Sequence, residues 1–179
     1  RNPAFPDASV TMRQLLSHRS GLRDKIDYIV PLDGDLSQVL AKPEAWEAAY
    51  PPGAYFSYAN INSPLIAAVM EGATGERFDR LMARLVLTPL KLDACYNWGE
   101  GCNDGRRAQA VTLLRPNGDL ARDAAITGKD PCPVYPATDG SCDVDSLYRL
   151  GRNGSAFSPQ GGLRISARDL AKVGQVLLN

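Results

Sequence analysis

The sequence predicts a mainly α-helical fold with a minor β-hairpin, in a single domain that spans residues 1–179. Three observations lead to this prediction. Apolar residues recur at i, i+3, i+4, i+7 and i+8 between residues 78 and 86, as in a helix that faces a core. A second helical pattern runs from about residue 58 to residue 73 and stops before Gly75. Asn117 and Gly118 separate two short apolar runs, which is typical of a hairpin turn.

The first helix is expected to begin at Thr11, because Thr11 and Gln14 have the spacing of a capping box. Leu15 and Leu16 supply its buried side, and Gly21 is expected to end it. Residues 24–34 have the composition of a loop.

Three further helices follow along the chain. A short one is expected from residue 36 to residue 40, before Pro43. In the helix over residues 58–73 the side chains expected in the core are Leu65, Val69 and Ala73. The short connection at Gly75 predicts that this helix and the next pack antiparallel as an αα-hairpin.

The second half of the chain is predicted to be less regular. The β-hairpin is placed at residues 110–123, and residues 127–158 form a long loop rich in Gly, Pro, Asp and Ser. Ser166 has the position of an N-cap for a last helix. The side chains of this helix expected to point inward are Leu170, Val173, Leu177 and Leu178.

Charge and hydropathy narrow the classes of partner. Twenty basic residues balance twenty acidic ones, so no net charge attracts nucleic acid or an anionic membrane. No apolar run approaches the roughly 20 residues that span a bilayer. The chain begins without a Met and stops on a helical pattern, so it is expected to be a fragment of a longer protein.

The four cysteines form two pairs that are close in sequence, Cys95 with Cys102 and Cys132 with Cys142. Zinc binding is one interpretation, but gaps of six and nine residues are not the short ligand spacings of zinc sites, and His18, the only histidine, is far away. Two local disulfides are favoured, and no metal ligand set is assigned. Disulfides indicate an oxidising compartment, either the periplasm or the exterior.

Tyr58 and Asn60 are the candidate site residues. Pro51, Pro52 and Gly53 redirect the chain just before them, so both lie at a sharply fixed point of the backbone, at the mouth of a helix. Taken alone, a Tyr-x-Asn triplet is more often structural than catalytic.

Three segments, in order, resemble the serine β-lactamase and penicillin-binding-protein superfamily, on its class C and esterase-like side. Residues 10–22 are similar to its I-T-x-R-x-L-L-x-H-T-S-G-L stretch, with Arg19 where Thr is usual. Residues 51–71 resemble P-P-G-x-x-F-x-Y-S-N-x-x-Y-x-L-L-G-x-I-I-E. Residues 161–171 are similar to G-G-L-x-S-T-A-R-D-L-A. Together they span nearly the whole chain.

The resemblance implies a serine acyl-transfer enzyme without a cofactor. Its nucleophilic Ser and a Lys form an S-x-x-K motif, which the Tyr-x-Asn motif faces. Tyr58 would be the catalytic residue, since a Lys ammonium beside it would stabilise a phenolate able to take the proton of Ser. Asn60 would bind substrate, because its amide both donates and accepts hydrogen bonds.

The sequence departs from this pattern in its other motifs. No Ser-x-x-Lys occurs in it, and Thr88, Pro89, Leu90 and Lys91 are rejected as a substitute because they end a helix. No Lys-Thr-Gly or His-x-Gly motif is present. The chain is therefore expected to be inactive alone. It is interpreted as the helical region of the β-lactamase/transpeptidase-like fold, lacking most of the α/β sheet domain.

The complete protein is then expected to hydrolyse a β-lactam, a D-Ala-D-Ala peptide or an ester, in the periplasm or outside the cell. The alternative is a non-catalytic scaffold or binding module of the same fold. An apolar face left open by the missing sheet domain predicts self-association. His18 is expected to be structural, whereas Trp46, Tyr50 and Tyr55 either line a cleft or pack under the turn. Gly161 and Gly162 lie either at the cleft or in a tight turn.

Overall fold

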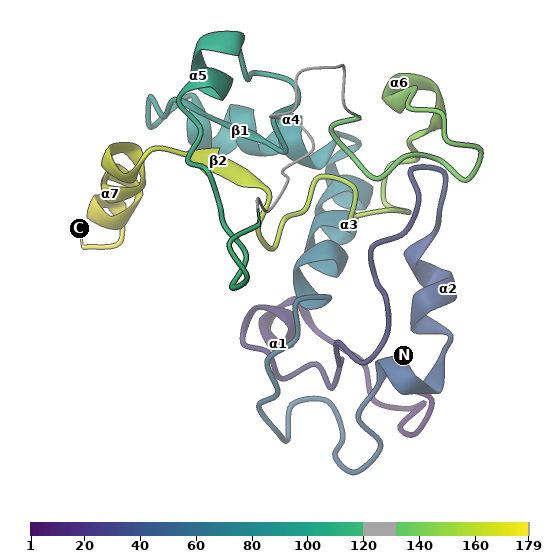
Figure 1. Cartoon of the computed structure of the whole chain (residues 1–179). Coiled ribbons are helices and arrows are strands. Elements are labelled where there is room, and N and C mark those ends of the chain that lie inside the picture. The colour runs from purple at the N-terminus through teal and green to yellow at the C-terminus, as the bar shows by residue number, and fades with distance from the viewer. Residues whose placement is uncertain (120–131, 179) are drawn as a thin grey trace.

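The computed structural model describes residues 1–119 and 132–178. Its regular elements are mostly helical, as the sequence predicts, and a small two-stranded antiparallel sheet accompanies them (Figure 1). In chain order they are α1 (Met12–Leu16), α2 (Leu36–Leu40), the 3₁₀ turn η1 (Pro43–Ala45), α3 (Asn62–Thr74), α4 (Phe78–Met82), the π-helical turn η2 (Ala83–Leu87), β1 (Ala94–Tyr96), α5 (Asp104–Ala108), α6 (Val144–Leu147), β2 (Leu163–Ile165) and α7 (Ala167–Val176).

Helix α3 runs through the centre of the view in Figure 1, with α1 near its lower end, α2 to its right, and α4 and the sheet towards its upper left. It ends at Gly75, whose left-handed backbone (φ 68°) forms the C-cap, as predicted. The face predicted to be buried is only partly right: Leu65 is half-buried against the core that contains Leu15, but Val69 and Ala73 are exposed. The buried side chains are instead Ala67, Ala68 and Glu71, with Asn62 and Pro64 in the first turn.

Small side chains on this face of α3 let another segment approach closely. A Cβ added to Gly154 would lie 1.9 Å from the Pro64 carbonyl oxygen and 2.7 Å from the Ala68 nitrogen. Backbone and helix therefore meet directly at Gly154. This contact explains why the core face of α3 carries alanines rather than the larger Leu and Val that a helical pattern favours.

The helix predicted over residues 78–86 is divided into α4 and η2. Phe78, Leu81 and Leu87 are buried, whereas Leu85 is 52% exposed. The widened π-helical turn changes the angular spacing of the residues that follow it, so the simple helical stripe ends at Met82. α3 and α4 are joined through Gly75 and contact one another.

The two strands come from segments far apart in the sequence. β1 pairs with β2 in antiparallel register, with Cys95 opposite Arg164. This sheet was not predicted. In the described residues, the turn of the predicted hairpin is formed, and the Arg115 nitrogen donates to the Asp119 carbonyl oxygen at 2.7 Å. Its second strand, residues 120–123, lies outside the described residues.

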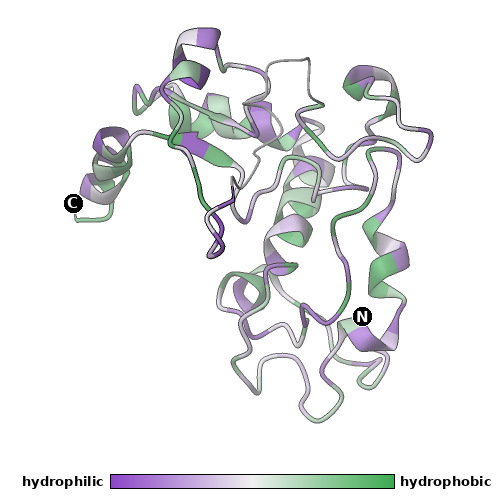
Figure 2. Ribbon diagram, in the orientation of Figure 1, coloured by the Kyte–Doolittle hydropathy of each residue, from purple (hydrophilic) through white to green (hydrophobic). Residues whose placement is uncertain are grey.

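Helix α7 begins as predicted, since the Ser166 hydroxyl caps it by accepting a hydrogen bond from the Asp169 nitrogen. Its predicted inward face is mostly wrong. Leu170, Leu177 and Leu178 are 54%, 84% and 86% exposed. Only Val173 packs, against a small cluster that contains Leu87. α7 carries both hydrophobic and hydrophilic residues (Figure 2) and projects from the body of the molecule (Figure 1).

Both predicted disulfides are present, Cys95–Cys102 and Cys132–Cys142, with Cα–Cα distances of 5.5 and 5.6 Å. The zinc alternative is excluded for these cysteines because each is bonded to its partner. Within the described ranges, no helix combines the length and apolarity needed to cross a membrane.

Candidate active site

The turn that precedes Tyr58 is hydrogen-bonded to the segment that follows α1. The Gly53 nitrogen donates to the Arg19 carbonyl oxygen at 2.7 Å, and the Ser57 nitrogen donates to the His18 carbonyl oxygen at 2.9 Å. Gly53 has φ +93°, and a Cβ on it would lie 2.7 Å from Nε2 of Gln14. The positive φ favours a glycine here, and a Cβ would also displace the Gln14 side-chain amide.

Tyr58 and Asn60 lie just before α3 rather than in its first turn, because the helix begins at Asn62. The Tyr58 side chain is 63% exposed. Its hydroxyl donates a hydrogen bond to Oδ1 of Asn60, with 3.2 Å between the oxygens. The structure thus brings the two predicted site residues together and leaves the phenol accessible from solvent.

The start of α3 is held by a side chain from elsewhere in the sequence. The N-cap residue, Ile61, makes no side-chain capping bond. The Asp24 carboxylate accepts from the Ile61 nitrogen at 3.1 Å and from the Asn60 nitrogen at 2.7 Å, so it satisfies backbone donors at this end. Oδ2 of Asp24, which accepts from the Asn60 nitrogen, also accepts from Nδ2 of Asn60 at 2.8 Å. Asp24 was not singled out from the sequence, where it is one polar residue in a loop.

His18 also contacts the turn that holds Tyr58. Its ring stacks on the Tyr58 ring, with centroids 4.4 Å apart and an interplanar angle of 29°. Its Nδ1 lies 3.3 Å from the Ala59 nitrogen, which can only donate, so Nδ1 is the acceptor and the proton is on Nε2. Nδ2 of Asn62 lies 3.1 Å from the same Nδ1. The expected structural role of His18 remains a prediction that this geometry supports.

A buried polar chain continues from Asn62 into the protein. The Ser20 hydroxyl donates to Oδ1 of Asn62 at 2.6 Å and accepts from the Leu22 nitrogen at 3.1 Å. Ser20 and Asn62 are each 1% exposed. Because buried polar groups without partners are costly, this chain ties the turn rigidly to the segment that follows α1.

The second tyrosine near Asp24 differs from Tyr58 in its environment. Burial, and after it the negative charge of Asp24, raise the pKa of Tyr28 above its ordinary value. Tyr28 is half-buried against the core that contains Leu15 and Trp46. Tyr28 is therefore held protonated, whereas the Tyr58 side chain is exposed to solvent.

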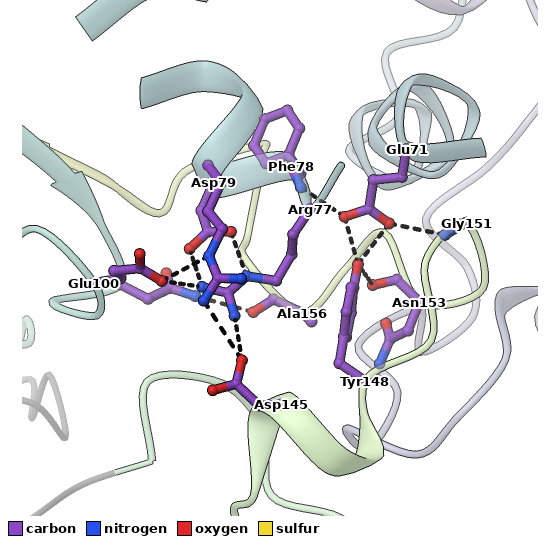
Figure 3. Close-up of polar contacts among 12 residues, drawn as sticks. Glu71, Arg77, Phe78, Asp79, Glu100, Asp145, Tyr148, Gly151, Asn153 and Ala156 are labelled. Carbon is purple, nitrogen blue, oxygen red and sulfur yellow. Dashed lines mark hydrogen bonds and ion pairs between the residues drawn. The ribbon is translucent and has the colours of Figure 1, made fainter. Parts of the chain in front are cut away.

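A second polar cluster lies at the other end of α3 (Figure 3). Glu71 is fully buried and accepts hydrogen bonds from the Tyr148 hydroxyl and from the Phe78 and Gly151 nitrogens. Beside it Arg77 pairs with three carboxylates, those of Asp79, Glu100 and Asp145. Because Glu71 has no exposed surface, its carboxyl group is suited to bracing segments rather than to meeting a substrate.

The remaining candidate residues differ in burial and contacts. Trp46 is buried and donates from Nε1 to the Leu40 carbonyl oxygen, so it packs in the core. Tyr50 and Tyr55 stack on each other at 5.1 Å and are about half exposed. A Cβ on Gly162 would lie 2.3 Å from Oδ1 of Asn97, which places this glycine in a close approach to Asn97.

A pocket of about 490 Å³ lies elsewhere, and neither Tyr58 nor Asn60 lines it. Its lining residues are Asp93, Trp98, Arg106, Gln109, Ala110, Val111, Leu113, Leu163, Arg164, Ile165, Ser166 and Ala167. Among residues 1–119 and 132–178, no group of three His, Cys, Asp or Glu side chains is placed to hold a metal ion.

Known proteins resemble the chain over most of its length. A family model described as Beta-lactamase matches residues 2–179. A D-aminopeptidase of Cereibacter sphaeroides (strain ATCC 17029 / ATH 2.4.9) is 29% identical over 145 residues, which cover 77% of this chain and 25% of the relative. The chain thus spans about a quarter of the length of this curated relative.

Solved structures show the same fold at low identity. A class C beta lactamase has a TM-score of 0.60 at 16% identity and matches 97% of this chain and 40% of its own. The D-amino acid amidase from Ochrobactrum anthropi SV3, complexed with D-phenylalanine, has a TM-score of 0.56 at 20% identity. The match covers 97% of this chain and 47% of the amidase chain.

Proposed function

The chain belongs to the Beta-lactamase family, and from this premise we propose that it forms the Tyr-x-Asn wall of a serine hydrolase that passes through an acyl-enzyme. The observation that carries the proposal is the exposed Tyr58 hydroxyl, hydrogen-bonded to Asn60 and fastened by His18 and Asp24. A fixed, accessible phenol at the start of a helix is suited to proton transfer.

Tyr58 takes the role of general base in this proposal. An ordinary tyrosine, with a pKa of about 10, is a poor base at neutral pH, so the phenolate needs a cation beside it. The S-x-x-K pair is absent from residues 1–179 and has to come from other residues. The phenolate accepts the serine proton as Oγ bonds to the substrate carbonyl carbon, and the proton then passes to the departing nitrogen.

The names of the relatives favour one substrate class. A D-aminopeptidase and a D-amino acid amidase both act on derivatives of D-amino acids, and both are similar to this chain. We therefore place amides or short peptides of D-amino acids ahead of β-lactams and esters. Asn60 contributes the polar side chain that meets the substrate beside Tyr58.

The experiment measures release of a D-amino acid from its amide by the full-length protein, together with labelling by a fluorophosphonate probe. Tyr58→Phe is expected to lower turnover by about 10²–10⁴, the usual contribution of a general base. Tyr135→Phe, at a tyrosine that is 57% exposed in another loop, is the matched control and should leave turnover unchanged. Full turnover in Tyr58→Phe would remove Tyr58 from the mechanism.

The second candidate is a non-catalytic scaffold or binding module. The absence of Ser-x-x-Lys from this sequence favours it. A full-length protein that lacks the motif, and takes no fluorophosphonate label, would establish this alternative. A labelled serine three residues before a lysine would exclude it.

The location and assembly of the protein are part of the same proposal. The two disulfides favour a periplasmic or secreted protein. The exposed leucines of α7 favour self-association of the isolated chain. Light scattering that shows a monomer at high concentration would contradict self-association.

A further inference from the structure

Asp24 makes a contact that capping of α3 does not require. Two of its three hydrogen bonds go to backbone nitrogens, those of Asn60 and Ile61, at the start of the helix. The third joins Oδ2 to the side-chain nitrogen of Asn60 at 2.8 Å, across 36 positions of sequence. Asp24 therefore acts on a side chain that the proposed function places in the site.

This third bond decides which way the Asn60 amide points. The two ends of an amide have nearly the same shape but opposite hydrogen-bonding character. With Nδ2 at the Asp24 carboxylate, Oδ1 faces the Tyr58 hydroxyl at 3.2 Å. The reversed amide would put its oxygen against a carboxylate oxygen, which is repulsive, and its NH₂ against Tyr58.

We propose that Asp24 is a positioning residue of the candidate site, which orients the Asn60 amide so that its oxygen accepts from Tyr58. The inference rests on the proposed function and adds to it a specific consequence. In this state Asn60 accepts from the protonated Tyr58 hydroxyl, the form that Tyr58 has after it receives the serine proton, and the second N–H of Asn60 is left to donate to a substrate carbonyl. Asp24 thereby selects the face of Asn60 that a substrate meets.

The test is a double-mutant cycle between Asp24→Ala and Asn60→Ala in the full-length protein, with kcat and KM measured on a D-amino acid amide. Asp24→Ala is expected to lower kcat about tenfold while Asn60 is present, the value of one oriented hydrogen bond. In the Asn60→Ala background it should change kcat by less than about twofold. Asp24→Asn, which keeps the size of the side chain and one acceptor, provides a second variant if Asp24→Ala does not fold.

Stability is measured on the four proteins of the cycle: the wild type, the two single variants and the double variant. The capping bonds predict that Asp24→Ala lowers stability whether Asn60 is present or replaced. Asp27→Ala is the control, since Asp27 lies in the same loop and its Oδ1 accepts from the local Ile29 nitrogen. An equal fall in kcat with and without Asn60 would overturn the inference and leave Asp24 as a cap. An unchanged kcat in Asn60→Ala would instead contradict the assigned role of Asn60. An unchanged kcat in Tyr58→Phe would contradict the proposed function itself.

Discussion

Both oxygens of the Glu71 carboxylate accept a hydrogen bond from the Tyr148 hydroxyl, and each lies 2.7 Å from the hydroxyl oxygen, although 77 positions separate the two residues. Glu71 also accepts from the Gly151 nitrogen at 2.9 Å and from the Phe78 nitrogen at 2.7 Å. One buried side chain thus joins α3 to the start of α4 and to the segment that follows α6 (Figure 3). The integrity of this part of the fold depends on that carboxyl group.

Glu71 is expected to make stability fall as pH rises above the ordinary range of a glutamate. Burial raises the pKa of Glu71, although hydrogen bonds from Gly151, Tyr148 and Phe78 act in the opposite direction. The folded protein then holds this proton more tightly than the unfolded chain. The contribution is fully present below the unfolded pKa, about 4.3, and is lost as pH rises through the folded one.

Urea unfolding of the wild type and of Glu71→Gln across this range provides the measurement. Other carboxylates, such as Asp35 and Glu47, have lowered pKa values and give stability that increases with pH. The difference in the free energy of unfolding between the two proteins isolates the contribution of Glu71. This difference should change with pH only above about 4.3. Curves that stay parallel throughout would show that Glu71 titrates alike in both states.

Tyr148→Phe is expected to destabilise the protein by about 1–3 kcal/mol, because a buried carboxyl loses a donor. Burial and the nearby Glu71 charge hold the pKa of Tyr148 above its ordinary value, so the hydroxyl stays protonated and donates. The ring still packs edge-on against Phe157, so little packing is lost. Tyr135→Phe serves as the exposed control and should fall within about 0.5 kcal/mol of the wild type. Equal effects of the two changes would mean that the Glu71 bond adds nothing.

Two glycines near α3 are expected to respond oppositely to alanine. A Cβ at Gly154 would overlap the Pro64 carbonyl oxygen, so Gly154→Ala must separate the loop from the helix. A Cβ at Gly72 meets nothing within 4 Å, and this exposed helical position should gain about 0.5–1 kcal/mol. Thermal unfolding of both variants measures the difference. A Gly154→Ala protein as stable as the wild type would contradict the close packing described for Pro64.

Local patterns were sufficient to predict several features of this fold. The capping box of Thr11 and Gln14 is formed in full, Asp35 begins α2 next to the predicted position, and Ser166 caps α7. Each of these depends on residues a few positions apart. The two disulfides could also be predicted from the sequence, because each pair closes a short loop.

Features set by distant segments could not be predicted in this way. The buried face of α3 is decided by Gly154, and the pairing of β1 with β2 joins residues about seventy positions apart. In the candidate site, Tyr58 and Asn60 were predicted, but Asp24 was not. Nothing in the sequence of a loop shows that its carboxylate reaches a helix start 36 residues later.

Removal of the disulfides is expected to lower stability unequally. Closing loops of this size contributes about 2–3 kcal/mol per bond through the unfolded chain. Cys95 is 2% exposed and clusters with Trp98, whereas Cys142 is exposed. Replacing Cys95 and Cys102 by alanine should therefore cost more than replacing Cys132 and Cys142, because buried sulfur packing is also lost. Denaturant unfolding of the two double variants tests the order, which the reverse result would refute.

His18 is expected to hold the Tyr58 turn mainly through its Nδ1 atom. His18→Asn keeps an acceptor close to the position of Nδ1 and tolerates the left-handed backbone at φ 52°. His18→Phe keeps a ring to stack on Tyr58 but leaves the Ala59 nitrogen without its acceptor. His18→Phe should then cost about 1–3 kcal/mol and His18→Asn clearly less.

Hydrogen exchange at the Ala59 amide separates the two contributions of His18, since it reports the bond to Nδ1 directly. Exchange should accelerate in His18→Phe and stay slow in His18→Asn. If turnover of the full-length protein follows Ala59 protection across both variants, the turn itself controls the placement of Tyr58. Should His18→Asn lose protection while His18→Phe keeps it, stacking of the two rings, rather than the acceptor, would be what fixes the turn.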